Sequence, residues 1–282
     1  MSTATGSAGE PSGARHPVPG PLAGFAVGVT AARRHGALAA LLERGGARVV
    51  LAPAVSVAPP GDDVPAHRWS RAEDPTPLRR LVGQAVAGTV DAIALTSGRE
   101  IAEALAVAAA DGLEEPLLDA LRDHVVAACV GPGTARALAG RGVATVQPDR
   151  ARLGALVRAL AADLPGRRSR WLSVRGAELE LRGHAVVLDG GLRPIAPAPM
   201  AMLRALARRP GHVVSRAELC GALPGRPGGG PATGAARPGA DEHAVEMAVA
   251  RLRRGLGRPG IVETVVKRGY RLACDPRPDD PP

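Results

Sequence analysis

Short apolar runs alternate with helical patterns along the first 165 residues, and this alternation constrains the fold more than any other feature of the sequence. In the helical patterns, apolar residues recur three or four positions apart, as in Leu38, Leu41 and Leu42. The runs that predict strands lie at 25–30, 48–52, 90–96, 125–130 and 144–147. Parallel strands need a crossover, usually a helix, to bring the chain back to the same end of the sheet. The pattern therefore predicts a doubly wound parallel α/β sheet within residues 22–165.

The carboxyl ends of these strands are where open α/β sheets bind ligands. Thr30 and Thr96 end two of these strands and Ser97 follows the second, and the turn 131–134 opens a helix whose amides could hold an anion, with a plain helix start as the alternative. Arg136 occupies the third-glycine position of a dinucleotide fingerprint, so no cofactor is predicted. A helix N-cap is favoured over a nucleophile at Ser97, because no histidine or acidic companion is close in sequence. No catalytic residue is predicted.

Charge divides the chain into two unequal halves. Residues 1–165 hold 16 arginines and 16 acidic residues, whereas residues 166–282 hold 20 basic and 11 acidic ones and carry the whole net charge of +9. A neutral half followed by a basic half is typical of a nucleic-acid-binding domain joined to another module, because phosphate contacts supply much of the affinity. The alternative is a solvated, arginine-rich surface, since 35 of the 36 basic residues are arginine.

Composition excludes several other classes of protein. Four aromatic residues are too few to build the stacking platforms of single-stranded nucleic-acid binders. The three cysteines, Cys129, Cys220 and Cys274, lack the spacing of a disulfide framework or a metal site, so no metal is predicted. Neither a secretion signal nor an apolar run of eighteen residues occurs in the sequence, so no membrane contact is expected and a cytoplasmic location is predicted.

Several segments of the first half resemble uroporphyrinogen-III synthase, namely 25–34, 41–50, 90–97 and 129–135, and 147–154 resembles its actinobacterial branch. The resemblance implies two similar lobes, with the second inserted after the second strand of the first. Here that strand leads through a proline-rich segment, expected to be a loop over 58–77, directly to the next strand of the same lobe. The inserted lobe is therefore expected to be missing.

A single lobe does not enclose the eight-carboxylate tetrapyrrole that the enzyme, a cyclising hydro-lyase, works on. The sequence thus leaves synthase activity open but favours its absence. The resemblance implies that the lobe retains residues able to bind a tetrapyrrole or another anion, namely Thr30, Arg33, Thr96, Ser97 and Thr134.

From Trp171 onward, the pattern changes to four short strands and then helices, in a domain expected over residues 170–274. Asp189-Gly190 predicts a tight hairpin turn. Ser215 and Glu218 form the pattern of a capping box at the start of a helix. The segment 224–240 is rich in glycine and proline and is expected to be a mobile loop, and residues 1–21 and 275–282 are expected to be tails.

The last helix is expected over 241–256, with Asp241 as its N-cap. An apolar stripe predicts the face that packs in the core; it consists of Val245, Ala248, Val249, Leu252 and Leu256. Small or basic residues on the other faces would let this helix enter the major groove of DNA. Two strands at 263–266 and 270–273 then enclose Lys267-Arg268-Gly269, which predicts a hairpin with a basic tip.

This order of elements, with residues 210–219, 251–256 and 269–272, resembles the effector domain of OmpR/PhoB-type regulators. The resemblance implies a winged helix-turn-helix in which Arg251 reads bases, Arg253 and Arg254 lie near phosphates and Arg271 lies in the wing. The candidate DNA-binding residues are His243, Met247, Arg251, Arg253, Arg254, Lys267, Arg268 and Arg271. An intradomain ion pair is the alternative for Arg253, and a solvated surface position is the alternative for His243.

Three functional hypotheses follow from the sequence. The favoured one is a sequence-specific transcriptional regulator, which binds double-stranded DNA, as a homodimer if it follows related domains, and whose synthase-like lobe senses a ligand or partner. The second is uroporphyrinogen-III synthase with an appended DNA-binding domain. The third is an interaction scaffold in which the lobe pairs with another chain.

Overall fold

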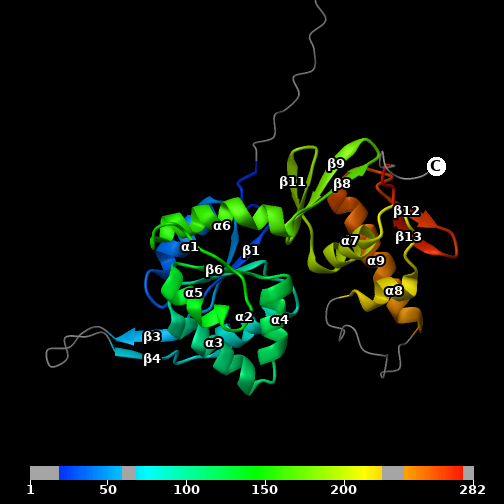
Figure 1. Ribbon diagram of the computed structural model, residues 1–282. Helices are drawn as coiled ribbons and strands as arrows, with labels where there is room; N and C mark the ends of the chain where they lie inside the picture. Colours follow the sequence, from blue (N-terminus) through cyan, green and yellow to red (C-terminus); the bar gives the residue numbers. More distant parts are fainter. Residues whose placement is uncertain (1–18, 59–67, 224–237, 276–282) are drawn as a thin grey trace, which may run out of the picture.

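The architecture comes from a computed structural model that describes residues 19–58, 68–223 and 238–275. Most of the predicted tails and of the predicted mobile loop at 224–240 lies outside these residues. Two compact parts follow each other along the chain and lie side by side, joined by helix α6 (Figure 1).

The first part contains the predicted parallel sheet. Its five strands are β1 (Ala26–Val29), β2 (Arg48–Leu51), β5 (Ala92–Leu95), β6 (Val126–Cys129) and β7 (Thr145–Val146). They lie in the order β2-β1-β5-β6-β7 and every neighbouring pair is parallel. The doubly wound fold class is thus confirmed, because β1 has its sequential neighbour on one side and β5 on the other.

Helices cover both faces of this sheet (Figure 1). Helices α1 (His35–Arg44) and α6 (Leu153–Arg168) share one apolar core with β1. The opposite core is formed by α2 (Thr76–Val86), α3 (Gly98–Ala110), α4 (Glu114–Asp123) and α5 (Pro132–Ala139). Strands such as β1 and β5 are fully buried, which explains why their sequences are continuously apolar rather than alternating.

The expected loop over 58–77 is wrong at both ends. Strands β3 (Val55–Ala58) and β4 (Arg68–Arg71) form an antiparallel hairpin, and α2 already begins at Thr76. The prolines that suggested a loop lie between the two strands or at the first turn of α2, where proline needs no hydrogen-bond partner for its nitrogen. Between β2 and β5 the chain has about 40 residues, too few for an inserted second lobe.

The second part is a winged helix. An antiparallel sheet in the order β11-β10-β9-β8 comes first. Its strands are β8 (Arg170–Val174), β9 (Ala177–Leu181), β10 (Ala185–Leu188) and β11 (Gly191–Pro194). There follow helices α7 (Pro197–Arg208), α8 (Arg216–Gly221) and α9 (Pro238–Leu256), and the hairpin β12 (Val262–Val265) with β13 (Gly269–Leu272). One apolar core joins all three helices to both sheets.

The hairpin turn and the helix starts predicted for this part have the expected geometry, with one exception. Asp189 and Gly190 both have positive φ, 51° and 78°, as a type I′ hairpin turn requires. Ser215 and Glu218 form the complete capping box of α8. The exception is α9, which begins at Pro238 and not after Asp241; proline is well suited to a first helical position because it has no N–H to leave unpaired. Among the helices that the structure describes, none has the length and apolar character needed to cross a membrane.

Candidate nucleic-acid interface

Helix α9 has one buried and one exposed face, as its sequence predicts. Val245, Val249 and Leu252 are at most 1% exposed and pack in the same core as α7 and α8. Since 3.6 residues make one turn, the residues on the opposite side of the helix must face outward. The buried stripe therefore fixes which side chains of α9 are presented to a partner.

The exposed face of α9 carries the predicted DNA-binding side chains. His243, Met247, Arg251 and Arg254 are spaced by four, four and three residues and are all exposed. This spacing places them in one row along the helix. Ala250 lies beside that row and is exposed too, so the surface combines cationic groups with a small side chain that permits close approach.

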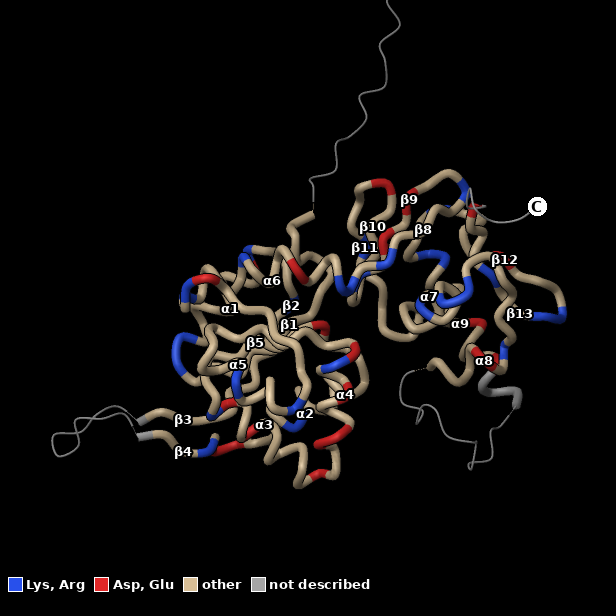
Figure 2. Tube along the Cα trace, in the orientation of Figure 1, with Lys and Arg blue, Asp and Glu red and all other residues tan. Residues whose placement is uncertain are grey.

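The β12–β13 hairpin ends in a basic tip, visible at the outer end of the second part (Figure 2). Val266, Lys267 and Arg268 form the connection and are all exposed, with Val266 at 78%. The backbone at Lys267 has φ of 60°, and at Gly269 φ is 136°. Close to this turn, β13 is paired with Val214, whose N–H and C=O exchange hydrogen bonds of 2.8 and 3.0 Å with Tyr270.

Arg253 connects α9 to this hairpin. Its Nε donates to the carbonyl oxygen of Val262 at 3.0 Å, and its Nη2 donates to Oγ1 of Thr264 at 2.8 Å. The guanidinium also lies 5.8 Å from the centre of the Tyr270 ring. Arg253 thus makes intradomain contacts, but with a carbonyl and a hydroxyl, and the ion pair of the alternative interpretation is not among the described contacts.

Arg271 is also held within the hairpin. Its Nε donates to Oε2 of Glu263 at 2.7 Å, and these two residues face each other in the register of β12 and β13. Arg175 approaches the other carboxylate oxygen at 3.4 Å. Two of the eight predicted DNA-binding residues therefore already have partners that hold the hairpin in place.

In the first part, four of the predicted anion-binding residues come together, but around a buried carboxylate. Glu100 is 1% exposed and its Oε2 accepts hydrogen bonds from Oγ1 of Thr30 at 2.9 Å and from the N–H of Thr96 at 2.8 Å. Its Oε1 accepts from Oγ1 of Thr96 at 2.5 Å and from Oγ of Ser97 at 3.1 Å. Thr134 joins the cluster through the carbonyl oxygen of Thr96, 3.4 Å away. An anion bound here would lie against this carboxylate.

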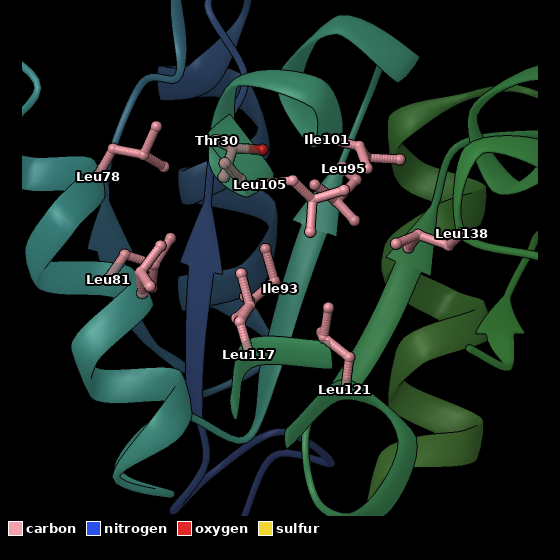
Figure 3. Close-up of a pocket in the computed structure, with 12 residues that line it drawn as sticks. Thr30, Leu78, Leu81, Ile93, Leu95, Ile101, Leu105, Leu117, Leu121 and Leu138 are labelled. Carbon is pink, nitrogen blue, oxygen red and sulfur yellow. The ribbon is translucent and has the colours of Figure 1, made fainter. Parts of the chain in front are cut away.

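The position of Arg33 and the size of the neighbouring cavity also do not favour an anion-binding site here. Arg33, the fifth predicted residue, is exposed in the turn after β1, and no described hydrogen bond or ion pair joins it to this cluster. The cavity beside Thr30 has about 20 Å³, space for one water molecule. Figure 3 shows its lining, and of the twelve described residues there Thr30 alone has a polar side chain. The tetrapyrrole site implied by the resemblance stays a prediction, and this arrangement does not favour it.

Sequence reasoning missed Glu100, although a signal was available. Ser97 and Glu100 have the Ser-x-x-Glu spacing of a capping box, and Ser97 is indeed the N-cap of α3, accepting from the N–H of Glu100. The carboxylate, however, turns inward to the ends of β1 and β5. Burial, followed by the negative charge of Glu100, raises the pKa of the nearby Cys129 thiol to about 12. Within the described residues, no cluster of three or more His, Cys, Asp or Glu side chains could hold a metal.

Two protein-family models match successive stretches of the chain. The family described as uroporphyrinogen-III synthase HemD matches residues 36–178, and the family described as transcriptional regulatory protein, C terminal, matches residues 194–272. A search of curated proteins gave no match.

Solved structures similar to parts of the chain include two structures of one synthase and one structure of a DNA-binding domain. Uroporphyrinogen III synthase of Thermus thermophilus is 16% identical over 49% of this chain and 98% of that chain, with a TM-score of 0.40. In a second structure, the wild-type synthase of Thermus thermophilus in another crystal form is 25% identical over 50% of each chain, with a TM-score of 0.31. The DNA-binding domain of Klebsiella pneumoniae RstA, solved in complex with the RstA box, is 26% identical over 37% of this chain and 97% of that chain, with a TM-score of 0.28.

Proposed function

The chain belongs to the uroporphyrinogen-III synthase HemD family and carries an OmpR/PhoB-type domain after it, and from this we propose that it is a sequence-specific, DNA-binding transcriptional regulator. In this proposal α9 lies in the major groove of double-stranded DNA and the β12–β13 hairpin lies against the neighbouring backbone. The synthase-like part senses a ligand or a partner, and the protein acts in the cytoplasm. The observation that carries the proposal is the exposed row on α9, held outward by a fully buried opposite face.

The positions of the side chains assign them different roles. Arg251, near the middle of the exposed row, is proposed to read a base edge, because a guanidinium can donate two hydrogen bonds to guanine. Arg254, Lys267 and Arg268 are proposed to contact phosphates, together with His243 near the beginning of the row. Met247, 39% exposed, is proposed to make apolar contact in the groove.

Arg253 and Arg271 are better understood as residues that position the hairpin. Their guanidinium groups are engaged by the Val262 carbonyl, the Thr264 hydroxyl and the Glu263 carboxylate. Any contact of these two arginines with phosphate would use the guanidinium N–H groups that are not already donated in these hydrogen bonds. The resemblance also leads us to propose that two copies bind adjacent half-sites, which the stoichiometry of the DNA complex would test.

The decisive experiment is genome-wide recovery of bound DNA, followed by gel retardation on the recovered sites at stated salt concentrations. Arg251→Ala is expected to weaken specific binding by about 1–3 kcal/mol and to relax the preference at one base position. Lys267→Ala is expected to weaken binding to all sequences and to lower the salt slope by about one. Arg158→Ala, an exposed arginine on α6, is the matched control. Equal effects of Arg251→Ala and the control would overturn the assignment of α9.

Family membership makes uroporphyrinogen-III synthase the alternative function. Against it, the short connection between β2 and β5 has no room for a second lobe, and the hydroxyl cluster at the strand ends already serves Glu100. Incubation of the purified protein with hydroxymethylbilane distinguishes the two. Enzymatic formation of the type III isomer would establish the synthase, whereas the regulator is expected to leave only spontaneous ring closure.

A further inference from the structure

A large cavity lies where the two parts of the chain meet. It has a volume of about 930 Å³ and is lined from the first part by residues of α2 and its neighbouring loops and from the second by residues of α7 and the end of α8. Apolar side chains make up much of its wall, including Val86, Leu113, Met200 and Leu223. Its size is that of a pocket for a small organic molecule.

Positive charge is concentrated along this cavity. Arg48, Arg204 and Arg208 line it, and among the described lining residues none is acidic. Arg204 is half-buried, and burial lowers the pKa of its guanidinium. Its two terminal nitrogens donate to the carbonyl oxygens of Gly88 and Gly183, which are neutral acceptors and supply no negative charge.

Among the described residues, the carboxylate whose charge acts on Arg204 is that of Asp91, and it is shared with other groups. Asp91 is 2% exposed, accepts from the N–H of Ala26 at 2.8 Å and lies 3.7 Å from Arg168. Its charge also acts on Arg204 and on His184. One buried acid therefore serves Arg168 and Arg204 together, while Arg48 and Arg208 add further positive charge at the cavity. For the half-buried Arg204, which shares this acid, positive charge costs free energy unless an anion compensates it, whereas Arg48 and Arg208 are exposed and add attraction for an anion.

A second observation concerns unused hydrogen-bonding groups. His184 lines the cavity and its Nδ1 is buried without a hydrogen-bond partner among the described residues, as is Nε of Arg168. Burial, with a smaller contribution from Arg48, lowers the pKa of His184. Buried polar atoms are nearly always paired in native proteins, so these two nitrogens mark hydrogen-bonding capacity that the described contacts leave unused next to the cavity wall.

We propose that this cavity is the binding site for a small organic anion, with an apolar body against Val86, Met200 and Leu223 and its acidic groups on Arg204, Arg208 and Arg48. The inference rests on the proposed regulatory function and names its effector site. Helix α7 links the site to DNA reading, because it lines the cavity and shares its core with α9. A ligand bound there would touch the helix that supports the recognition helix.

The test uses two fluorescent probes with the same apolar body. 1-Anilinonaphthalene-8-sulfonate carries one negative charge, whereas N-phenyl-1-naphthylamine carries none. We expect the full chain to bind the sulfonate at one site, and at least tenfold more tightly than the neutral probe, as one charge-assisted hydrogen bond would give. Arg208→Gln, on the exposed last turn of α7, is expected to weaken sulfonate binding about tenfold, and Arg158→Gln is the control with the same loss of charge.

A third variant tests the location. Ala87 is exposed at the end of α2 and lines the cavity, so Ala87→Trp would fill it from a position where a large side chain does not disturb the core. Loss of sulfonate binding in Ala87→Trp supports the proposal. Equal binding of both probes, or equal weakening by Arg208→Gln and Arg158→Gln, would overturn it by showing only adventitious surface binding.

The same variants separate this inference from the proposed function. Retardation of DNA by Arg208→Gln and Ala87→Trp without probe is expected to equal that of the wild type, because neither residue lies on α9 or the hairpin. If the wild type fails to bind DNA but binds the sulfonate as described, the regulatory function falls and the anion site remains. If the wild type binds DNA normally but does not bind the sulfonate as described, the anion site falls and the regulatory function remains.

Discussion

The buried carboxylate of Glu100 offers the sharpest test of how the first part is held together. Four donors converge on it, from Thr30, Thr96 and Ser97, and join the ends of β1 and β5 to the start of α3. Hydrogen bonds to a charged group contribute about 1.5–3 kcal/mol each, so their gross sum is about 6–12 kcal/mol. Burying the carboxylate costs several kcal/mol. We therefore expect Glu100→Ala to lower the free energy of unfolding by about 3 kcal/mol.

Urea unfolding can measure this effect in the first part alone. Trp69 and Trp171 are the two tryptophans of the chain, so Trp171→Phe leaves a single reporter on β4. That reporter lies 5.9 Å from the guanidinium of Arg99, in the first turn of α3. With a slope of about 2 kcal/mol per molar, 3 kcal/mol corresponds to a midpoint lower by about 1.5 M urea.

Glu103→Ala is the matched control on the same helix. Its carboxylate pairs with Arg71, which is 78% exposed, so its loss is expected to cost less than about 1 kcal/mol. In Glu100→Gln, the hydroxyls can rotate to donate or accept, and an intermediate loss of about 1 kcal/mol is expected. A midpoint for Glu100→Ala within error of that for Glu103→Ala would refute the reasoning that this cluster stabilises the sheet.

Three further predictions concern the second part. Arg253→Ala removes two hydrogen bonds and a ring contact and is expected to cost about 1–2 kcal/mol of stability in calorimetry, whereas the exposed Arg254→Ala should cost less than about 0.5 kcal/mol. Gly269→Ala would place a methyl group against the Val214 carbonyl at a position with positive φ, and is expected to lower the free energy of unfolding by at least about 2 kcal/mol. The control Gly190→Ala, where positive φ is the sole penalty, is expected to lower it by about 1 kcal/mol. Equal losses of stability in the two variants would contradict this prediction. Hydrogen bonds from the Ser215 backbone, then from Arg209 and the Ser215 hydroxyl, lower the pKa of Glu218 to about 2. The stability that this cap contributes is therefore present above pH 4.5 and is lost as the pH falls toward 2. An NMR titration of the Glu218 carboxyl with a midpoint near pH 4.5 would exclude this contribution.

Much of the fold could be predicted because its signals are local. The five parallel strands were marked by continuous apolar runs, and the turn at Asp189-Gly190 and the capping box at Ser215 by residues with specific backbone preferences. The same locality explains the errors. The β3–β4 hairpin was hidden by prolines that in fact lie beside its strands or in the first turn of α2, and the start of α9 by an acidic residue that resembles an N-cap.

The candidate interface was predictable in part for the same reason. The exposed row of α9 follows from helical periodicity, because a buried stripe leaves the opposite face outward. No periodicity indicates that Arg253 and Arg271 are engaged inside the domain, since their partners belong to other elements and to a register that only the folded hairpin sets.

The amino-acid order alone determined the two fold classes, the order of their elements and the helix face that carries the basic row, since each depends on neighbours a few positions apart. Tertiary structure decided how residues 65 and 70 positions apart meet at Asp91 and Glu100, and how both parts of the chain enclose a cationic cavity. Such contacts depend on the packing of whole elements against one another, which spacing along the chain does not encode.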